Sequence, residues 1–155
     1  MTPKSIIRAA NTRVSELQIF SGENSTVVVG APGSGKNAML MGMLMQRGVA
    51  DCTMIVTEMR ASDMAEKLGT GALVVNGGLD LESLVGAVAF ACTQPRSDIF
   101  IEHVSPILGH NIVEILESIA KPFNKRIYVG MQAARSHSGL GDNYQTQMMN
   151  TLKLG

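Results

Sequence analysis

The sequence has little of what marks secreted, membrane-spanning or strongly basic proteins. No apolar run approaches about 18 residues, and the N-terminus has no charged segment followed by an apolar stretch. The 13 basic and 13 acidic residues cancel, so no overall field draws the chain to nucleic acid or to an anionic membrane. We therefore expect a cytoplasmic protein that binds no membrane and whose contacts with nucleic acid are local.

Cysteine and histidine are also scarce. Cys52 and Cys92 lack metal-ligand spacing, which predicts two small, buried hydrophobic side chains in a reducing compartment. The three histidines, His103, His110 and His137, lack such spacing as well, so we expect polar surface or loop residues. The 155 residues are enough for one compact domain with a sizeable core.

Strand-like and helix-like segments alternate along the chain. Apolar runs predict strands near residues 26–30, 53–57, 72–76, 98–102 and 126–131, and helix-forming stretches predict helices near 36–46, 61–68, 80–93 and 110–121. Because the expected strands are continuously apolar, they should be buried on both faces. The pattern predicts an α/β fold of three layers, with helices on both sides of a mainly parallel sheet.

An amphipathic helix is expected before this sheet. Thr2 and Pro3 supply an N-cap and a first-turn proline. Apolar residues then recur at helical spacing, namely Ile6, Ile7, Ala10, Val14 and Leu17. We expect a helical arm over residues 1–22 and a single domain over residues 23–155. The arm either packs on its own sheet or docks on a neighbouring subunit, and the sequence leaves both open.

The most informative segment runs from Gly30 to Asn37. It fits the phosphate-binding pattern G-x-x-x-x-G-K-[ST] at every position except the last, with an apolar strand before it and a helix after it. The glycines let backbone N–H groups face a phosphate, the helix N-terminus adds positive charge, and Lys36 reaches the β- and γ-phosphates. The candidate nucleotide-binding residues are Gly30, Gly33, Ser34, Gly35, Lys36, Asn37 and Ala38.

Asn37 departs from the pattern. A serine or threonine hydroxyl usually coordinates the Mg²⁺ of the bound nucleotide at this position, and an amide oxygen has a different reach and angle. Asn37 is therefore either a tolerated replacement or the mark of a slow hydrolase, and both interpretations stay open. We expect ATP and Mg²⁺ as ligands, with binding better supported than hydrolysis.

Polar residues stand at the ends of the second, fourth and fifth expected strands, where ligands of parallel sheets bind. They are Glu58, Glu102 and Gln132. One acid can hold Mg²⁺, a second can position or deprotonate the attacking water, and an amide can sense the γ-phosphate. We predict these three as catalytic residues, and Asn37 and Glu102 as metal ligands.

With these residues in place, the chain resembles the core of RecA-type recombinases and their relatives. Residues 53–69 look like the family segment in which a strand ends at the catalytic glutamate, here Glu58. Residues 98–105 are similar to the family's second acidic strand, although Glu102-His103 replaces the usual Asp-Ser. Gln132 matches the nucleotide-sensing glutamine. The hexameric RNA-packaging motors of cystoviruses share this layout, including a short arm before the core.

The resemblance implies a RecA-like P-loop domain over residues 23–155 in which Glu58 positions water, Glu102 organises Mg²⁺ and Gln132 reports the γ-phosphate. It implies an oligomeric ATPase that assembles or moves on nucleic acid. Residues 133–143 would form the nucleic-acid-binding loop, although no aromatic platform precedes Tyr144. The chain ends where the family begins another strand, which indicates a minimal version or a fragment.

Two further interpretations remain. A neighbouring subunit often completes such a site with a basic residue, for which Arg60 and Arg135 are the candidates, also for contacts with nucleic acid. The main alternative to an ATPase is a nonhydrolysing module whose assembly or regulation depends on nucleotide. A small-molecule kinase would need an arginine-rich lid, which the sequence lacks.

Overall fold

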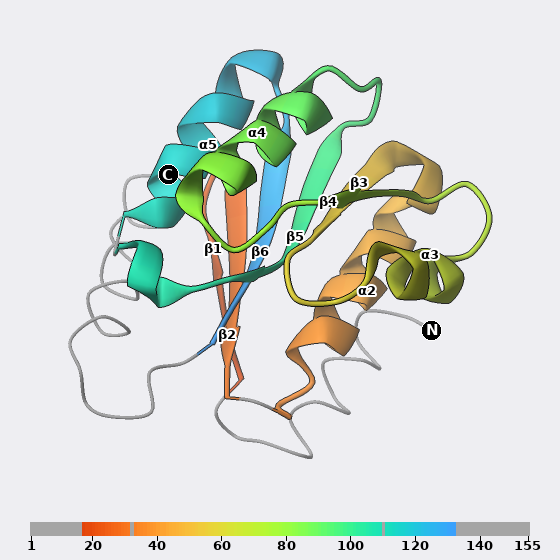
Figure 1. Cartoon of the computed structure of the whole chain (residues 1–155), viewed down its shortest axis with the longest axis horizontal. Coiled ribbons are helices and arrows are strands. Elements are labelled where there is room, and N and C mark those ends of the chain that lie inside the picture. Colours follow the sequence, from red (N-terminus) through yellow and green to blue (C-terminus); the bar gives the residue numbers. More distant parts are fainter. Residues whose placement is uncertain (1–16, 32, 110, 133–155) are drawn as a thin grey trace.

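The computed structural model describes residues 17–31, 33–109 and 111–132, and every structural statement below concerns these residues (Figure 1). The strands are β1 Gln18–Ser21, β2 Ser25–Gly30, β3 Cys52–Val56, β4 Leu73–Asn76, β5 Asp98–Val104 and β6 Arg126–Gln132. The helices are α2 Lys36–Arg47, α3 Ala61–Leu68, α4 Leu81–Cys92 and α5 Ile112–Ala120. Short 3-10 turns cover Val49–Asp51, Pro106–Leu108 and Lys121–Phe123. The five predicted strands and four predicted helices in this part of the chain are confirmed, with ends shifted by a few residues at most.

The six strands form one sheet in the order β1-β2-β6-β5-β3-β4. Strands β2, β6, β5, β3 and β4 are parallel, and β1 pairs antiparallel with β2 at the edge. The carboxyl ends of the parallel strands therefore lie at one edge of the sheet, which is where the phosphate-binding segment follows β2 (Figure 1). The prediction of a mainly parallel α/β sheet is confirmed.

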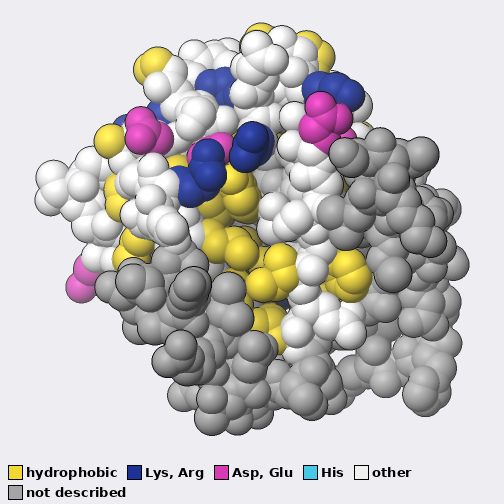
Figure 2. All heavy atoms as spheres, turned by 180° about the vertical axis from the view of Figure 1, so that it is seen from behind, with side chains coloured by type: hydrophobic (Ala, Val, Ile, Leu, Met, Phe, Trp, Pro, Cys, Tyr) yellow, Lys and Arg dark blue, Asp and Glu magenta, His cyan; other side chains and the backbone are white. Residues whose placement is uncertain are grey.

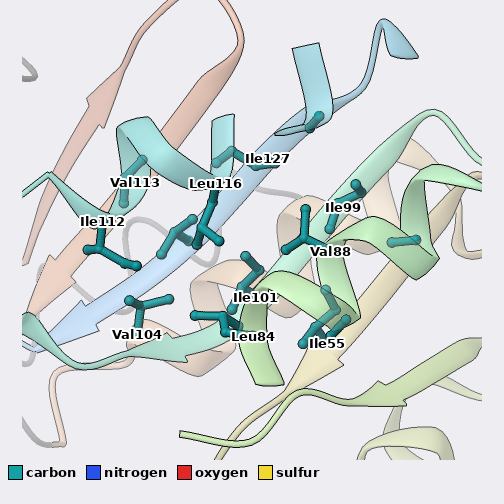
Figure 3. Close-up of a cluster of buried hydrophobic side chains, with 14 of the residues drawn as sticks. Ile55, Leu84, Val88, Ile99, Ile101, Val104, Ile112, Val113, Leu116 and Ile127 are labelled. Carbon is teal, nitrogen blue, oxygen red and sulfur yellow. The ribbon is translucent and has the colours of Figure 1, made fainter. Parts of the chain in front are cut away.

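Helices cover both faces of this sheet, because successive strand residues point to opposite sides. On one face, Leu84 and Val88 of α4 and Leu116 of α5 pack against apolar residues of the central strands, among them Ile99 and Ile101 (Figure 3). On the other face, the buried side chains of α2 and α3 pack against the intervening strand residues; this cluster includes Val28, Met39, Leu40, Leu44, Met54, Met64, Phe100 and Tyr128. The result is the three-layer arrangement that the apolar strands predict.

The expected helical arm is wrong over its last part. Gln18–Ser21 is strand β1, in which Gln18 pairs with Val29 and Ser21 pairs with Thr26. The backbone N–H of Gly22 donates to the carbonyl of Ser25 at 2.6 Å, which closes the turn to β2. The segment joins the sheet because an antiparallel edge strand satisfies its own backbone groups and those along the outer edge of β2. Residues 1–16 and 133–155, and with them most of the predicted arm, lie outside the described residues.

The cysteines behave as predicted. Cys52 and Cys92 are buried, free thiols. Burial raises the pKa of the Cys52 thiol to about 12, so it stays protonated and unreactive at neutral pH.

Within the described residues, no helix is long and apolar enough to cross a membrane.

Strand β5 carries a bulge near its carboxyl end. Ile101 pairs with Val129 and Val104 pairs with Met131, so β5 has one residue more than β6 over this stretch. The bulge presses the Glu102 carbonyl against Gly130, where an added Cβ would lie 2.3 Å from that oxygen. Bulges redirect side chains and are frequent beside functional sites. Here the redirected residues are Glu102 and His103.

Candidate nucleotide-binding site

The segment between β2 and α2 has the backbone of a phosphate-binding loop. Gly33 and Gly35 have φ of 80° and 90°, values that favour glycine. The Ser34 N–H donates to the Ala31 carbonyl at 3.0 Å, which tightens the turn. Gly30 also needs to be glycine, because an added Cβ would lie 2.2 Å from the buried Ser34 Oγ. Helix α2 starts directly after Gly35, so its N-terminal N–H groups open at the loop.

A cavity of about 480 Å³ lies against this loop. Its size is within the usual range for small-molecule sites. The residues that line it come from the loop, from the turn after β3 and from the end of β6; they are Ala31, Gly33, Ser34, Gly35, Lys36, Asn37, Ala38, Glu58 and Gln132. Gly30 lies behind them, paired with Gln132 in the β2–β6 ladder. Most of the residues predicted from the sequence are thus brought together at one place.

Lys36 is the first residue of α2 and reaches across the site. Its Nζ lies 2.8 Å from Nδ1 of His103. Because an ammonium can only donate, Nδ1 accepts, and the His103 proton is then on Nε2. Burial lowers the pKa of Lys36, and the negative charges of Glu58 and Glu102 oppose that shift. The ammonium has three N–H donors, so two remain for groups in the cavity.

Glu58 lies on the turn after β3, near the same ring nitrogen of His103 that Lys36 contacts. Its side chain is 57% exposed, and its Oε1 lies 3.7 Å from His103 Nδ1. The side chain therefore faces water and the cavity. A carboxylate so placed can accept a proton from a water molecule held in that space.

Glu102 has a different place from the one expected. Its Oε1 accepts the backbone N–H groups of Thr57, Glu58 and Met59 at 3.0, 3.1 and 3.0 Å. The side chain is buried and is not among those that line the cavity. The three N–H groups give Oε1 a supporting role, because an oxygen so occupied offers little to a cation. The metal-organising role of Glu102 stays a prediction. Oε1 of Glu102 fixes the turn that presents Glu58.

His103 corrects a second expectation. It is only 7% exposed, and not a polar surface residue. Its carbonyl accepts the Thr57 hydroxyl at 2.6 Å, and its Nδ1 lies near both Lys36 Nζ and Glu58 Oε1. The signal that could have found it was the polar pair Glu102-His103 inside an otherwise apolar strand. The other two histidines lie outside the described residues.

The basic residues expected to act on a neighbouring subunit or on nucleic acid stay a prediction. Arg60 is exposed at the N-cap of α3 and does not line the cavity. Arg135 lies outside the described residues. Among the residues described, no group of three or more His, Cys, Asp or Glu side chains could hold a metal ion by itself.

The fold and the cavity define a three-layer α/β protein with a glycine-rich loop and a cavity at the carboxyl edge of its mainly parallel sheet. A scan against protein-family models finds no match for the chain, and a search of curated proteins finds no similar one.

Proposed function

We propose that this chain is an ATP-binding P-loop ATPase. The observation that carries the proposal is the cavity in which the loop, Lys36, Glu58 and Gln132 lie together. The backbone N–H groups of the loop and the Lys36 ammonium would bind the β- and γ-phosphates. Glu58 would position and deprotonate the attacking water, and Gln132 would contact the γ-phosphate.

The site fits nucleotide-bound Mg²⁺, although the chain supplies few ligands. Mg²⁺ keeps several waters and is usually held by one or two side chains together with phosphate oxygens. The residues that line the cavity and carry a side-chain oxygen are Ser34, Asn37, Glu58 and Gln132. Bound there, Mg²⁺ would neutralise charge on the phosphates.

Replacing Lys36 with alanine tests the binding half of the proposal. A hydrogen bond to a charged group contributes about 1.5 to 3 kcal/mol, so Lys36→Ala should weaken the affinity for MgATP at least about tenfold. Isothermal titration calorimetry measures this directly. Lys67→Ala, which removes an exposed lysine of α3 far from the cavity lining, is the matched control and should bind as the wild type does. A wild type that does not bind MgATP, or equal affinity in Lys36→Ala, would overturn the proposal.

The second candidate function is a nonhydrolysing module whose assembly responds to nucleotide. Asn37 favours it, because this exposed side chain replaces the hydroxyl that usually holds Mg²⁺. Both functions share the binding site, and they differ in turnover. Steady-state phosphate release from MgATP separates them: release above the uncatalysed rate supports the ATPase, and its absence together with tight binding supports the module.

The resemblance to RecA-type proteins adds a homo-oligomer and nucleic acid to the proposal. Exposed apolar side chains before and along α4, at Leu79, Leu81 and Phe90, are compatible with a subunit contact. On the face shown in Figure 2, the Lys and Arg side chains lie beside Asp and Glu, so any contact with nucleic acid would be local.

Assembly should respond to nucleotide, because a ligand that binds the assembled form better shifts the equilibrium toward it. We expect sedimentation velocity to show a larger species when MgATP is added to the wild type, and no such change for Lys36→Ala. A protein that stays monomeric with and without MgATP at roughly tens of micromolar would rule out the motor and filament forms of the proposal.

A further inference from the structure

We infer that His103 is a positioning residue for Lys36, holding its ammonium toward the phosphates and away from Glu58. The inference rests on the proposed nucleotide site. It concerns a residue that the phosphate-loop pattern does not include, and it gives a reason for the histidine that follows Glu102 in β5.

The contact itself is direct and partly buried. Lys36 Nζ lies 2.8 Å from His103 Nδ1, a normal hydrogen-bond distance, and the histidine is only 7% exposed. Water therefore competes poorly for the ring. The backbone of His103 is also fixed, because its carbonyl accepts the Thr57 hydroxyl at 2.6 Å. The acceptor that meets the ammonium is thus held in place by the fold.

The bulge in β5 is what allows this placement. With one extra residue between the Ile101 and Val104 pairs, two consecutive residues of β5 both serve the site. Glu102 holds the turn that carries Glu58, and His103 holds the lysine of the loop. Because of the bulge, one strand supports both the turn that carries Glu58 and the lysine of the loop.

The acidic residues near Lys36 indicate what this hydrogen bond does. The negative charges of Glu58 and Glu102 attract the Lys36 ammonium. They raise the pKa of the lysine, against the lowering that burial causes. Yet among the described residues no carboxylate lies within 4.0 Å of the Lys36 ammonium, which instead donates to the ring of His103. Burial and the nearby Lys36 charge lower the pKa of His103, which favours the neutral imidazole. Without that acceptor, the ammonium would be free to pair with the exposed Glu58 carboxylate, whose Oε1 lies 3.7 Å from the same Nδ1 of His103. A Lys36–Glu58 ion pair would take both residues away from a nucleotide.

Two substitutions separate this role from simple packing. His103→Leu removes the acceptor and puts an apolar side chain of moderate size in its place. His103→Asn offers an amide oxygen near the place of Nδ1. We expect His103→Leu to weaken MgATP binding about tenfold in calorimetry, whereas His103→Asn should stay within about threefold of the wild type. Thermal unfolding of each variant reports whether the fold is kept.

The outcomes are distinct. If Lys36→Ala loses affinity but His103→Leu binds as tightly as the wild type, or more tightly, the positioning role is overturned and the nucleotide site remains. Equal losses in the Leu and Asn variants at unchanged melting temperatures would likewise overturn it. A wild type that binds no MgATP removes the proposed function itself.

A measurement on the unmodified protein covers the case in which His103→Leu does not fold. In ¹⁵N NMR of the histidines, His103 should show an unprotonated Nδ1 that accepts a hydrogen bond and a protonated Nε2. Its Nδ1 resonance should move in Lys36→Ala. A protonated Nδ1 at neutral pH, or no change in that variant, would contradict the inference.

Discussion

Replacement of Glu58 by glutamine should lower the rate of ATP hydrolysis about 100-fold or more and leave MgATP affinity nearly unchanged. General base catalysis typically contributes about 10²- to 10⁴-fold, and the amide keeps the shape of the side chain while removing its basicity. The side chain is 57% exposed, so the exchange disturbs no packed core. The backbone N–H of Glu58 still donates to Glu102 in the variant, which keeps the turn in place.

The measurement is steady-state phosphate release alongside calorimetry on the same preparations. Glu66→Gln is the matched control, since this glutamate lies exposed on α3 and does not line the cavity. It should hydrolyse ATP as the wild type does. Unchanged turnover in Glu58→Gln would show that Glu58 is a solvated strand-end residue and would leave the site without a base.

Replacement of Gly130 by alanine should be the most destabilising single-methyl change in the sheet. The added Cβ would lie 2.3 Å from the Glu102 backbone oxygen and 2.8 Å from Cδ1 of Leu40. The leucine can move, but the carbonyl belongs to the bulge and cannot move without changing it. We expect a loss of about 3 kcal/mol in the free energy of unfolding, at the upper end of overpacking effects.

Urea unfolding followed by a spectroscopic probe measures the stability of the variant, and calorimetry measures its affinity for MgATP. Gly86→Ala is the control, because Gly86 lies in α4 with open space where its Cβ would be, and alanine there should be neutral or stabilising by up to about 1 kcal/mol. A shift of the bulge in Gly130→Ala should also weaken nucleotide binding, since Glu102 and His103 move with it. Equal stability of the two alanine variants would show that the bulge relaxes freely.

The sequence was sufficient for most of the architecture. Long apolar runs and helix-forming stretches carry their own periodicity, so the parallel strands and the helices between them were predicted close to their observed bounds. The edge strand β1 was missed because four residues are too few to show alternation, and the helical spacing before them runs on to Leu17. The antiparallel pairing with β2 decides that segment, and pairing is a property of two strands.

The sequence predicts those residues of the candidate site whose place in the fold follows from their position along a single strand or loop. Lys36, Glu58 and Gln132 belong to that group, and all three line the cavity. Glu102 and His103 do not, because their directions depend on a bulge that exists only when β5 meets β6. From the sequence of β5 alone, Glu102 is only an acid at the end of a strand. In the folded chain its Oε1 accepts backbone N–H groups of the turn after β3.

The strand order also has a consequence for the sequence of folding events. β2 leads into the phosphate loop, and its inner neighbour is β6, where Ser25 pairs with Ile127 across about 100 residues of chain. Contacts of such long range close late, after local hairpins and helices have formed. During synthesis, the loop is made early but its supporting strand gains its inner partner only near the end of the described chain. The proposed capacity to hold a nucleotide would therefore arise at a late step, and incomplete chains that lack β6 would carry the loop without Gln132 and the strand beside it.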